Sequence, residues 1–424
     1  MIVVGMVTVV SARPGVRTAG VRFSSRNVGP NWYAAVMGTS IVGSAGAAVP
    51  GSPGWLRAGC TGVWVLAAAL LGLVLAARAA HWAGHLDEAR RQLLDPAVAP
   101  FYGCLPMALL SVGGGALTLG PRVIGEHAAV TADAALWTAG TVSALLVAAG
   151  VPYLMVTRHR IGAADASPVW LLPVVAPMVA AALGPALVPH LPAGARQARE
   201  ALLLGCYAMF GLSLLATLML LPLVWGRLLR YGPLPVALTP ALFLVLGPLG
   251  QSTTAAGALA DAGPYAVAPQ YATALRGFAV LYGVPVMGFA LLWLAMAAAM
   301  ALRAARRGLR FSMTWWAFTF PVGTCATGAA ALARHTGLHA ASWLAVVLYV
   351  ALVAAWAAAA AGTLHGLLTG TLPAPAAAPA PQPAVAAAGT PQPAPADGQP
   401  AVAAASAAAR TVGAVASEGP YQVR

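Results

Sequence analysis

The sequence predicts an all-α membrane protein with ten transmembrane helices, and three observations lead to that prediction. Hydrophobic residues make up 60% of the 424-residue chain, charged residues make up only 8%, and the mean hydropathy is +0.80. A soluble globular protein is about 25% charged, so this chain has too little charge to cover a water-facing surface. Apolar segments of about 20 residues, the length that crosses a bilayer, recur along the chain. Alternate segments begin at regular intervals.

Ten apolar segments lie between a basic start and a tail rich in alanine and proline. We expect a short cytoplasmic tail over residues 1–26, a transmembrane domain over 27–370 and a disordered cytoplasmic tail over 371–424. The last part has too few large apolar residues to form a core. The expected spans are residues 30–49, 57–80, 98–119, 132–156, 168–188, 199–225, 237–260, 273–301, 314–333 and 341–370.

The distribution of arginine predicts the topology. All 23 basic residues are arginine, and most lie in short loops between the apolar segments. With the N-terminus inside, 17 of them fall on the cytoplasmic side and 6 on the outside, the asymmetry that the positive-inside rule describes. We therefore expect a multi-pass protein of the plasma membrane with both termini in the cytoplasm. The same scattering argues against nucleic acid as a partner, despite a net charge of +13.

A repeat predicts how the helices are arranged. The odd-numbered segments begin near residues 30, 98, 168, 237 and 314, at intervals of 68 to 77 residues. Internal prolines mark most of these segments, among them Pro106, Pro177, Pro248 and Pro321, whereas the even-numbered segments are smoother. A proline inside a helix removes a backbone hydrogen bond and kinks the helix, which is tolerated where neighbours or water satisfy the freed groups. We therefore expect five helical hairpins around a central pore, with kinked odd helices inside and even helices outside.

Residues 314–332, TWWAFTFPVGTCATGAAAL, contain the most distinctive of these prolines. Pro321 lies near the middle of this uncharged segment, Phe320 directly precedes it, and the hydroxyls of Thr319 and Thr324 flank it. A bulky ring at a kink of an inner helix predicts a plug for the pore. Ordinary packing in the protein interior is the other interpretation of this phenylalanine.

The acidic residues indicate an uncharged path. No Asp or Glu lies in the central part of an expected span, and Asp133 is placed at a helix start, where a carboxylate suits the helix dipole. Proton-coupled transporters usually need an intramembrane carboxylate or histidine. The expected path is lined by hydroxyls such as Thr39, by glycines and by backbone exposed at kinks, which suits passive movement of anions. Helix packing through small residues is the alternative interpretation of these positions.

Motifs for catalysis or metal binding are absent from the sequence. It has no phosphate-binding loop, nucleophile elbow or zinc-protease motif, so we expect neither an enzyme nor a cofactor. His81 and His85 are spaced to share one face of a helix, but no third ligand is obvious. No metal site is expected.

Four blocks of sequence resemble the tellurite-resistance/dicarboxylate transporter family. This family includes the TehA-like proteins, yeast malate and sulfite exporters and the plant slow-anion-channel-like proteins, and it is also described as a voltage-dependent anion channel family. The similarity covers about residues 27–370 in the expected order. The blocks are residues 29–43 (GPNWYAAVMGTSIVG), 168–184 (PVWLLPVVAPMVAAALG), 238–252 (LTPALFLVLGPLGQS) and 315–324 (WWAFTFPVGT).

The resemblance implies a homotrimer in which each subunit has its own pore, with Phe320 occluding it. It also implies that Pro106, Pro177, Pro248 and Pro321 mark the kinked inner helices. The expected function is an integral membrane channel or transporter for small inorganic anions or C4-dicarboxylates. The alternative is a proton- or gradient-coupled exporter of dicarboxylate, malate or sulfite, of the tellurite-resistance type.

Overall fold

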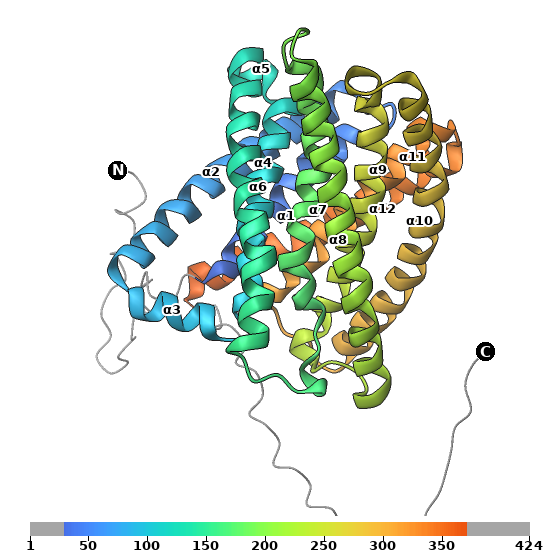
Figure 1. The fold of residues 1–424 in the computed structure, drawn as a ribbon. Helices are drawn as coiled ribbons and strands as arrows, with labels where there is room; N and C mark the ends of the chain where they lie inside the picture. The colour runs from blue at the N-terminus through green and yellow to red at the C-terminus, as the bar shows by residue number, and fades with distance from the viewer. Residues whose placement is uncertain (1–28, 371–424) are drawn as a thin grey trace, which may run out of the picture. The chain divides into compact units, whose positions relative to one another are not determined.

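The computed structural model describes residues 29–370, which form a bundle of helices without a strand in that range (Figure 1). The predicted tails, residues 1–26 and 371–424, lie outside the described residues. The α-helices are α1 (Tyr33–Ala48), α2 (Gly54–Gly84), α3 (Leu86–Leu94), α4 (Cys104–Leu119), α5 (Pro121–Ile124), α6 (Glu126–Thr157), α7 (Leu171–Leu183), α8 (Arg196–Tyr231), α9 (Leu246–Ala266), α10 (Pro269–Arg306), α11 (Phe320–Thr336) and α12 (His339–Thr369). The 3-10 helices are η2 (Pro30–Trp32), η3 (Ala99–Gly103), η4 (Ala163–Asp165), η5 (Pro168–Trp170), η6 (Gly184–His190), η7 (Val236–Val245) and η8 (Met313–Phe318).

Eight helical segments of the described part are long and apolar enough to cross a membrane. This confirms an all-α protein with several membrane-crossing helices. They are Gly54–Gly84, Ala99–Leu119, Glu126–Thr157, Pro168–His190, Arg196–Tyr231, Val236–Ala266, Pro269–Arg306 and His339–Thr369. Helices α1 and α11 are not among these eight, because they have only 16 and 17 residues.

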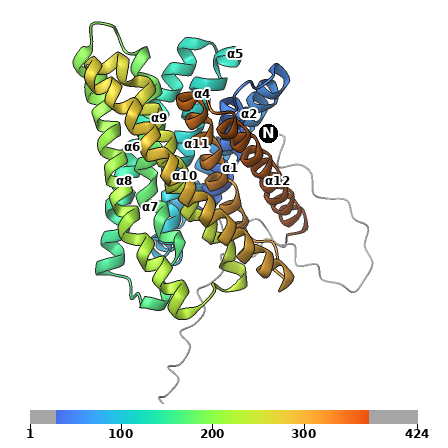
Figure 2. The ribbon, with the colours of Figure 1, turned by 90° about the vertical axis from the view of Figure 1, so that its right-hand side faces the viewer.

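Burial divides the long helices into two classes. In the segments that contain α4, α7 and α9, 78 to 89% of the most apolar 18-residue stretch is buried inside the protein. In α2, α6, α8, α10 and α12 the same share is only 17 to 28%, so these helices present leucine, valine and alanine outward. Helices α1 and α11 bury most of their residues, and Figure 2 shows α11 between α10 and α12. The buried class contains the odd-numbered segments of the sequence.

The five buried helices contact one another in a closed ring. Helix α1 packs against α4, α4 against α7, α7 against α9, α9 against α11, and α11 returns to α1. Each also packs against the long exposed helix that follows it in the chain: α2, α6, α8, α10 and α12 respectively.

Three of the four prolines singled out in the sequence lie at junctions between 3-10 and α-helix rather than in the middle of a helix. Pro106 and Pro248 are the third residues of α4 and α9, and Pro321 is the second residue of α11. Each of these helices follows a 3-10 segment. The first amide groups of an α-helix have no α-helical acceptor, so a proline there loses no hydrogen bond. Pro177 differs because it lies inside α7.

Tryptophan side chains of exposed helices hydrogen-bond to backbone carbonyls of the buried segments. The indole of Trp64 in α2 donates to the Val112 oxygen at 3.0 Å, and that of Trp137 in α6 donates to the Ala180 oxygen at 3.0 Å. In the same way Trp293 of α10 donates to the oxygen of Leu242 at 2.9 Å. A buried indole N–H needs such a partner, so each bond holds an outer helix at one rotation and height.

Glycines set the close contact between α9 and α11. A Cβ added at Gly250 would collide with the backbone nitrogen of Cys325, and one at Gly328 would lie 3.0 Å from the Gly250 oxygen. The two backbones therefore approach as closely as glycine allows, as in small-residue packing of membrane helices. Gly247, one turn earlier on α9, is different, because a Cβ there would meet nothing within 4 Å.

Replacement of Gly250 by alanine is expected to lower the stability of the bundle by about 1–3 kcal/mol, because the new methyl group overpacks the contact with α11. Gly247→Ala is the matched control on the same helix, and it should leave stability unchanged or raise it slightly. Thermal unfolding in detergent micelles measures both variants. Equal melting temperatures would contradict this account of the α9–α11 contact.

Candidate functional site

Phe320 is the first residue of α11 and is 3% exposed. Two nearby residues orient it in the ring. Gly323 faces α1, where a Cβ would collide with Ile41, and Thr324 faces α9, with its Oγ1 3.4 Å from the Leu246 oxygen. Successive residues of an α-helix are rotated by about 100°, so the Phe320 direction falls between these two neighbours. The side of α11 between its two ring neighbours is the side toward the interior of the ring.

Two threonines continue this face of α11 and α9. Thr327 follows Phe320 by seven residues, about two turns, and so shares its face. Its hydroxyl lies 2.8 Å from the hydroxyl of Thr254. Both threonines are partly exposed, although most residues of α9 and α11 are buried. Gly247 precedes Thr254 by the same seven residues. It is buried, yet it borders open space, because a Cβ added there would have no other atom within 4 Å.

Helix α4 adds two more hydroxyls to the same interior. Gly114 faces Leu183 of α7, and Leu119 faces Gly43 of α1. Ser111 and Thr118 are seven residues apart, and their shared direction falls between these two neighbours. Their hydroxyls donate to carbonyl oxygens of their own helix, at 2.7 and 2.9 Å respectively. The face directed at the ring interior is therefore uncharged and carries hydroxyl groups.

The three threonines singled out in the sequence lie at contacts between helices. The Thr39 hydroxyl accepts a hydrogen bond from Trp356 of α12 at 3.1 Å, and the Thr319 hydroxyl donates to the Trp316 oxygen at 2.7 Å. Thr324 packs against α9 as described above. All three are buried. Three further hydroxyl residues, Ser111, Thr118 and Thr254, were not predicted for the interior face, although their spacing in the sequence indicates a shared face. They form seven-residue pairs with each other or with a glycine.

Charged groups lie at the ends of the buried helices. Arg78 is 4% exposed and donates hydrogen bonds to Gln92 at 3.0 Å and to the hydroxyl of Tyr102, in the 3-10 segment before α4, at 3.3 Å. Near the last turns of α9 and α11, Asp261 forms an ion pair with Arg334 at 3.6 Å, and its Oδ1 lies 3.3 Å from Nε2 of His335. Within the described residues, α1, α4 and α7 contain no Asp, Glu, Lys or Arg, and the charged side chains of α9 and α11 lie near the last turns of these helices.

His81 and His85 stack with their ring centroids 5.8 Å apart. Within residues 29–370, no group of three metal-ligating side chains comes together, there or elsewhere.

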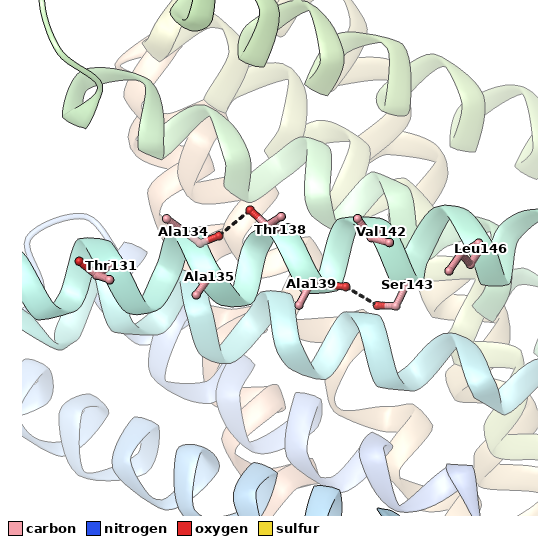
Figure 3. Close-up of a pocket in the computed structure, with 8 residues that line it drawn as sticks. All are labelled: Thr131, Ala134, Ala135, Thr138, Ala139, Val142, Ser143 and Leu146. Atoms are coloured by element: carbon pink, nitrogen blue, oxygen red, sulfur yellow. Dashed lines mark hydrogen bonds between the residues drawn. The ribbon is translucent and has the colours of Figure 1, made fainter.

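An open groove lies on the outward face of α6, away from the ring interior. Its volume is about 740 Å³. Figure 3 shows its lining along one side of α6, where Thr138 and Ser143 hydrogen-bond to carbonyl oxygens of their own helix and the remaining side chains are mostly small. The groove is a helix surface exposed in the single chain.

A ring of buried helices with an uncharged interior, enclosed by lipid-facing helices, defines a multi-pass membrane protein of the channel or transporter class. The chain belongs to the voltage-dependent anion channel family, whose model matches residues 27–364. The protein is accordingly an anion channel or transporter.

Several curated relatives are transporters. The chain is 25% identical over 346 residues to an uncharacterized transporter of Methanocaldococcus jannaschii, an alignment that covers 81% of this chain and 95% of the relative. It is 27% identical over 320 residues to sulfite efflux pumps of Arthroderma otae and Trichophyton rubrum, which covers 73% of this chain and 82% of each pump.

Removal of the hydroxyl pair is expected to slow anion flux. In the double variant Thr254→Val/Thr327→Val two methyl groups replace hydroxyls that can hydrogen-bond to a passing anion, so we expect flux to fall by about tenfold, the equivalent of about 1.4 kcal/mol. Thr138→Val, on the outward face of α6, is the control and should keep the wild-type rate. Flux into proteoliposomes measures both. A normal rate in the folded double variant would place these hydroxyls outside the path.

Proposed function

We propose that small anions cross the membrane through the interior of the ring formed by α1, α4, α7, α9 and α11, and that the Phe320 ring occludes this path. The observation that carries the proposal is the direction of Phe320, between the contacts of α11 with α1 and α9. The unfilled space beside Gly247 and the uncharged hydroxyl-bearing face beyond Phe320 support it. A dehydrated anion is stabilised there by hydroxyl and backbone dipoles, without a fixed cation that would trap it.

The proposed path requires α1 and α11 to cross the bilayer as well. Each continues a 3-10 segment that rises about 2.0 Å per residue, against 1.5 Å in the α-helix. With η2, α1 reaches about 30 Å, and with η8, α11 reaches about 37 Å, enough for a hydrocarbon core of about 30 Å. Ten crossings arranged as five hairpins then place both termini on one side. The arginine asymmetry makes that side the cytoplasm, and we propose the plasma membrane as the location.

Phe320→Ala is expected to raise anion conductance by about tenfold or more, because it removes the ring from the path without removing a hydrogen bond. Phe318→Ala is the matched control. Its ring packs against Phe243 at 4.7 Å and Trp315 at 5.9 Å, so its loss should lower stability and leave conductance unchanged. Gly247→Leu should do the opposite of Phe320→Ala, since its side chain fills the open space. Liposome electrophysiology with chloride and nitrate reads all three variants. An unchanged conductance in folded Phe320→Ala would exclude the gate.

Coupled export is the second candidate, and the sulfite efflux pumps among the relatives favour sulfite as the first anion to test. A channel moves the anion only down its own electrochemical gradient, whereas a coupled exporter uses a pH gradient to move the anion against that gradient. A panel of sulfite, malate, chloride and nitrate, measured with and without a pH gradient, separates the two.

We also propose that the protein assembles as a homotrimer, with the groove on α6 as one of the contacts between subunits. Its alanines allow a neighbouring helix to approach closely. Ala139→Leu, which fills the groove, is expected to shift the trimer toward monomer at least several-fold, while Ala298→Leu on the exposed face of α10 serves as the control. Light scattering in detergent reports the mass. A trimer that survives Ala139→Leu would move the contact to another helix.

A further inference from the structure

Helix α6 buries a carboxyl group that the proposed path does not use. Asp133 is 1% exposed, and neither of its carboxyl oxygens has a hydrogen-bond partner. From the sequence, this residue is expected at a helix start, where the dipole would favour it. That placement is wrong, because α6 begins at Glu126, and Asp133 lies about two turns inside the helix, beyond the reach of the dipole.

The carboxyl group lies directly against the buried helix α4. A Cβ at Gly113 would sit 2.9 Å from Asp133 Oδ1, so only glycine leaves room for it. The next two glycines play the same part for other neighbours, Gly114 for Leu183 of α7 and Gly115 for Trp64 of α2. Asp133 therefore packs on the stretch of α4 that also carries Ser111 and Thr118 on its interior face.

No charge compensates Asp133 within the described part of the chain. Helix α6 packs against α4, α5, α7, η3 and η6. Helix α7 has no titratable side chain, and none of the titratable groups on the other elements or on α6 itself forms an ion pair or a hydrogen bond with Asp133. Of these groups, Arg122, Glu126, His127 and His190 are exposed. Tyr102 of η3 and Cys104 of α4 precede Gly113 by nine or more residues, and Tyr153 lies several turns further along α6 than Asp133.

An ionised carboxylate in such a place is very unfavourable, because it has lost its hydration and gained neither a donor nor a counter-ion. The close packing of α4 on α6 is therefore compatible with the neutral carboxyl group. Release of the proton requires water or a donor to reach Asp133, and this requires α4 and α6 to separate locally.

We propose that Asp133 is a proton-binding site whose occupancy sets the position of α4, so that anion transport by this protein depends on pH. The inference rests on the proposed path through the ring, of which α4 is one wall. The step is a proton exchange with water: binding breaks one O–H bond of a hydronium ion and forms one on the carboxylate, and release returns the proton to a water molecule and leaves a carboxylate. The site supplies the intramembrane acid that proton-coupled transporters use.

The test compares anion flux in proteoliposomes at a series of pH values for the wild type, Asp133→Asn and Glu126→Gln. Asparagine has the shape of the neutral carboxyl group and does not titrate. We expect wild-type flux to change with pH, and Asp133→Asn to keep the wild-type flux of the acidic limit at every pH. Glu126→Gln removes an exposed carboxylate from the same helix and should keep the wild-type profile. An Asp133→Asn profile that follows the wild type, or a wild-type flux independent of pH, would overturn the proposal.

A second measurement does not depend on transport. Difference infrared spectroscopy of the reconstituted protein detects the C=O stretch of a protonated carboxyl group as the pH is raised. In the wild type we expect a band that disappears at high pH. Glu126→Gln should show the same band and the same loss at high pH, and Asp133→Asn should lack the band. A wild-type protein without this band would overturn the proton site even if anions are transported. A wild type that shows the band but moves no anion would overturn the proposed function alone. The wild-type spectrum also decides the question if Asp133→Asn fails to fold.

Discussion

The close contact between α9 and α11 is the constraint on which the rest of the structure depends. The ring closes only if these two helices approach at Gly250 and Gly328. A Cβ at Gly250 would collide with the backbone of α11, and one at Gly328 would lie 3.0 Å from the Gly250 oxygen. The same approach brings the hydroxyls of Thr254 and Thr327 to 2.8 Å and sets the rotation of α11. Because Phe320 begins that helix, its direction follows from this contact rather than from its own packing.

Most polar groups inside the bundle find hydrogen-bond partners where the helices pack against one another. In lipid, every backbone group needs a partner from the protein, and the 3-10 segments before α4, α9 and α11 allow proline without the loss of a bond. Indole groups from α2, α6 and α10 add hydrogen bonds to carbonyl oxygens of the buried segments. Asp133 departs from this arrangement, since both of its oxygens are buried without a partner. That departure, together with its contact with Gly113, is the observation from which we propose Asp133 as a proton-binding site.

The hydroxyl residues illustrate how much of the site was predictable. Thr39, Thr319 and Thr324 attract notice in the sequence because they lie in glycine-rich stretches or beside Pro321, and all three pack between helices. The hydroxyl pairs that lie on a helix face directed at the ring interior, such as Ser111 with Thr118, are separated by seven residues. That spacing can be read from the sequence. The sequence does not show which neighbouring helix each face contacts. Without that information, the face directed at the ring interior cannot be told from the faces that pack against other helices.

The sequence by itself determined the membrane class, the alternation of buried and exposed helices, and the family, because composition, spacing and local blocks are properties of the chain read in one dimension. Only the tertiary structure decided that Pro106, Pro248 and Pro321 lie at the starts of helices, that Phe320 points between α1 and α9, and that Asp133 is buried against Gly113. Each of these depends on which residue of another helix lies opposite. A helix surface repeats every 3.6 residues, so the chain alone leaves the rotation of each helix undetermined, and contacts between helices select it.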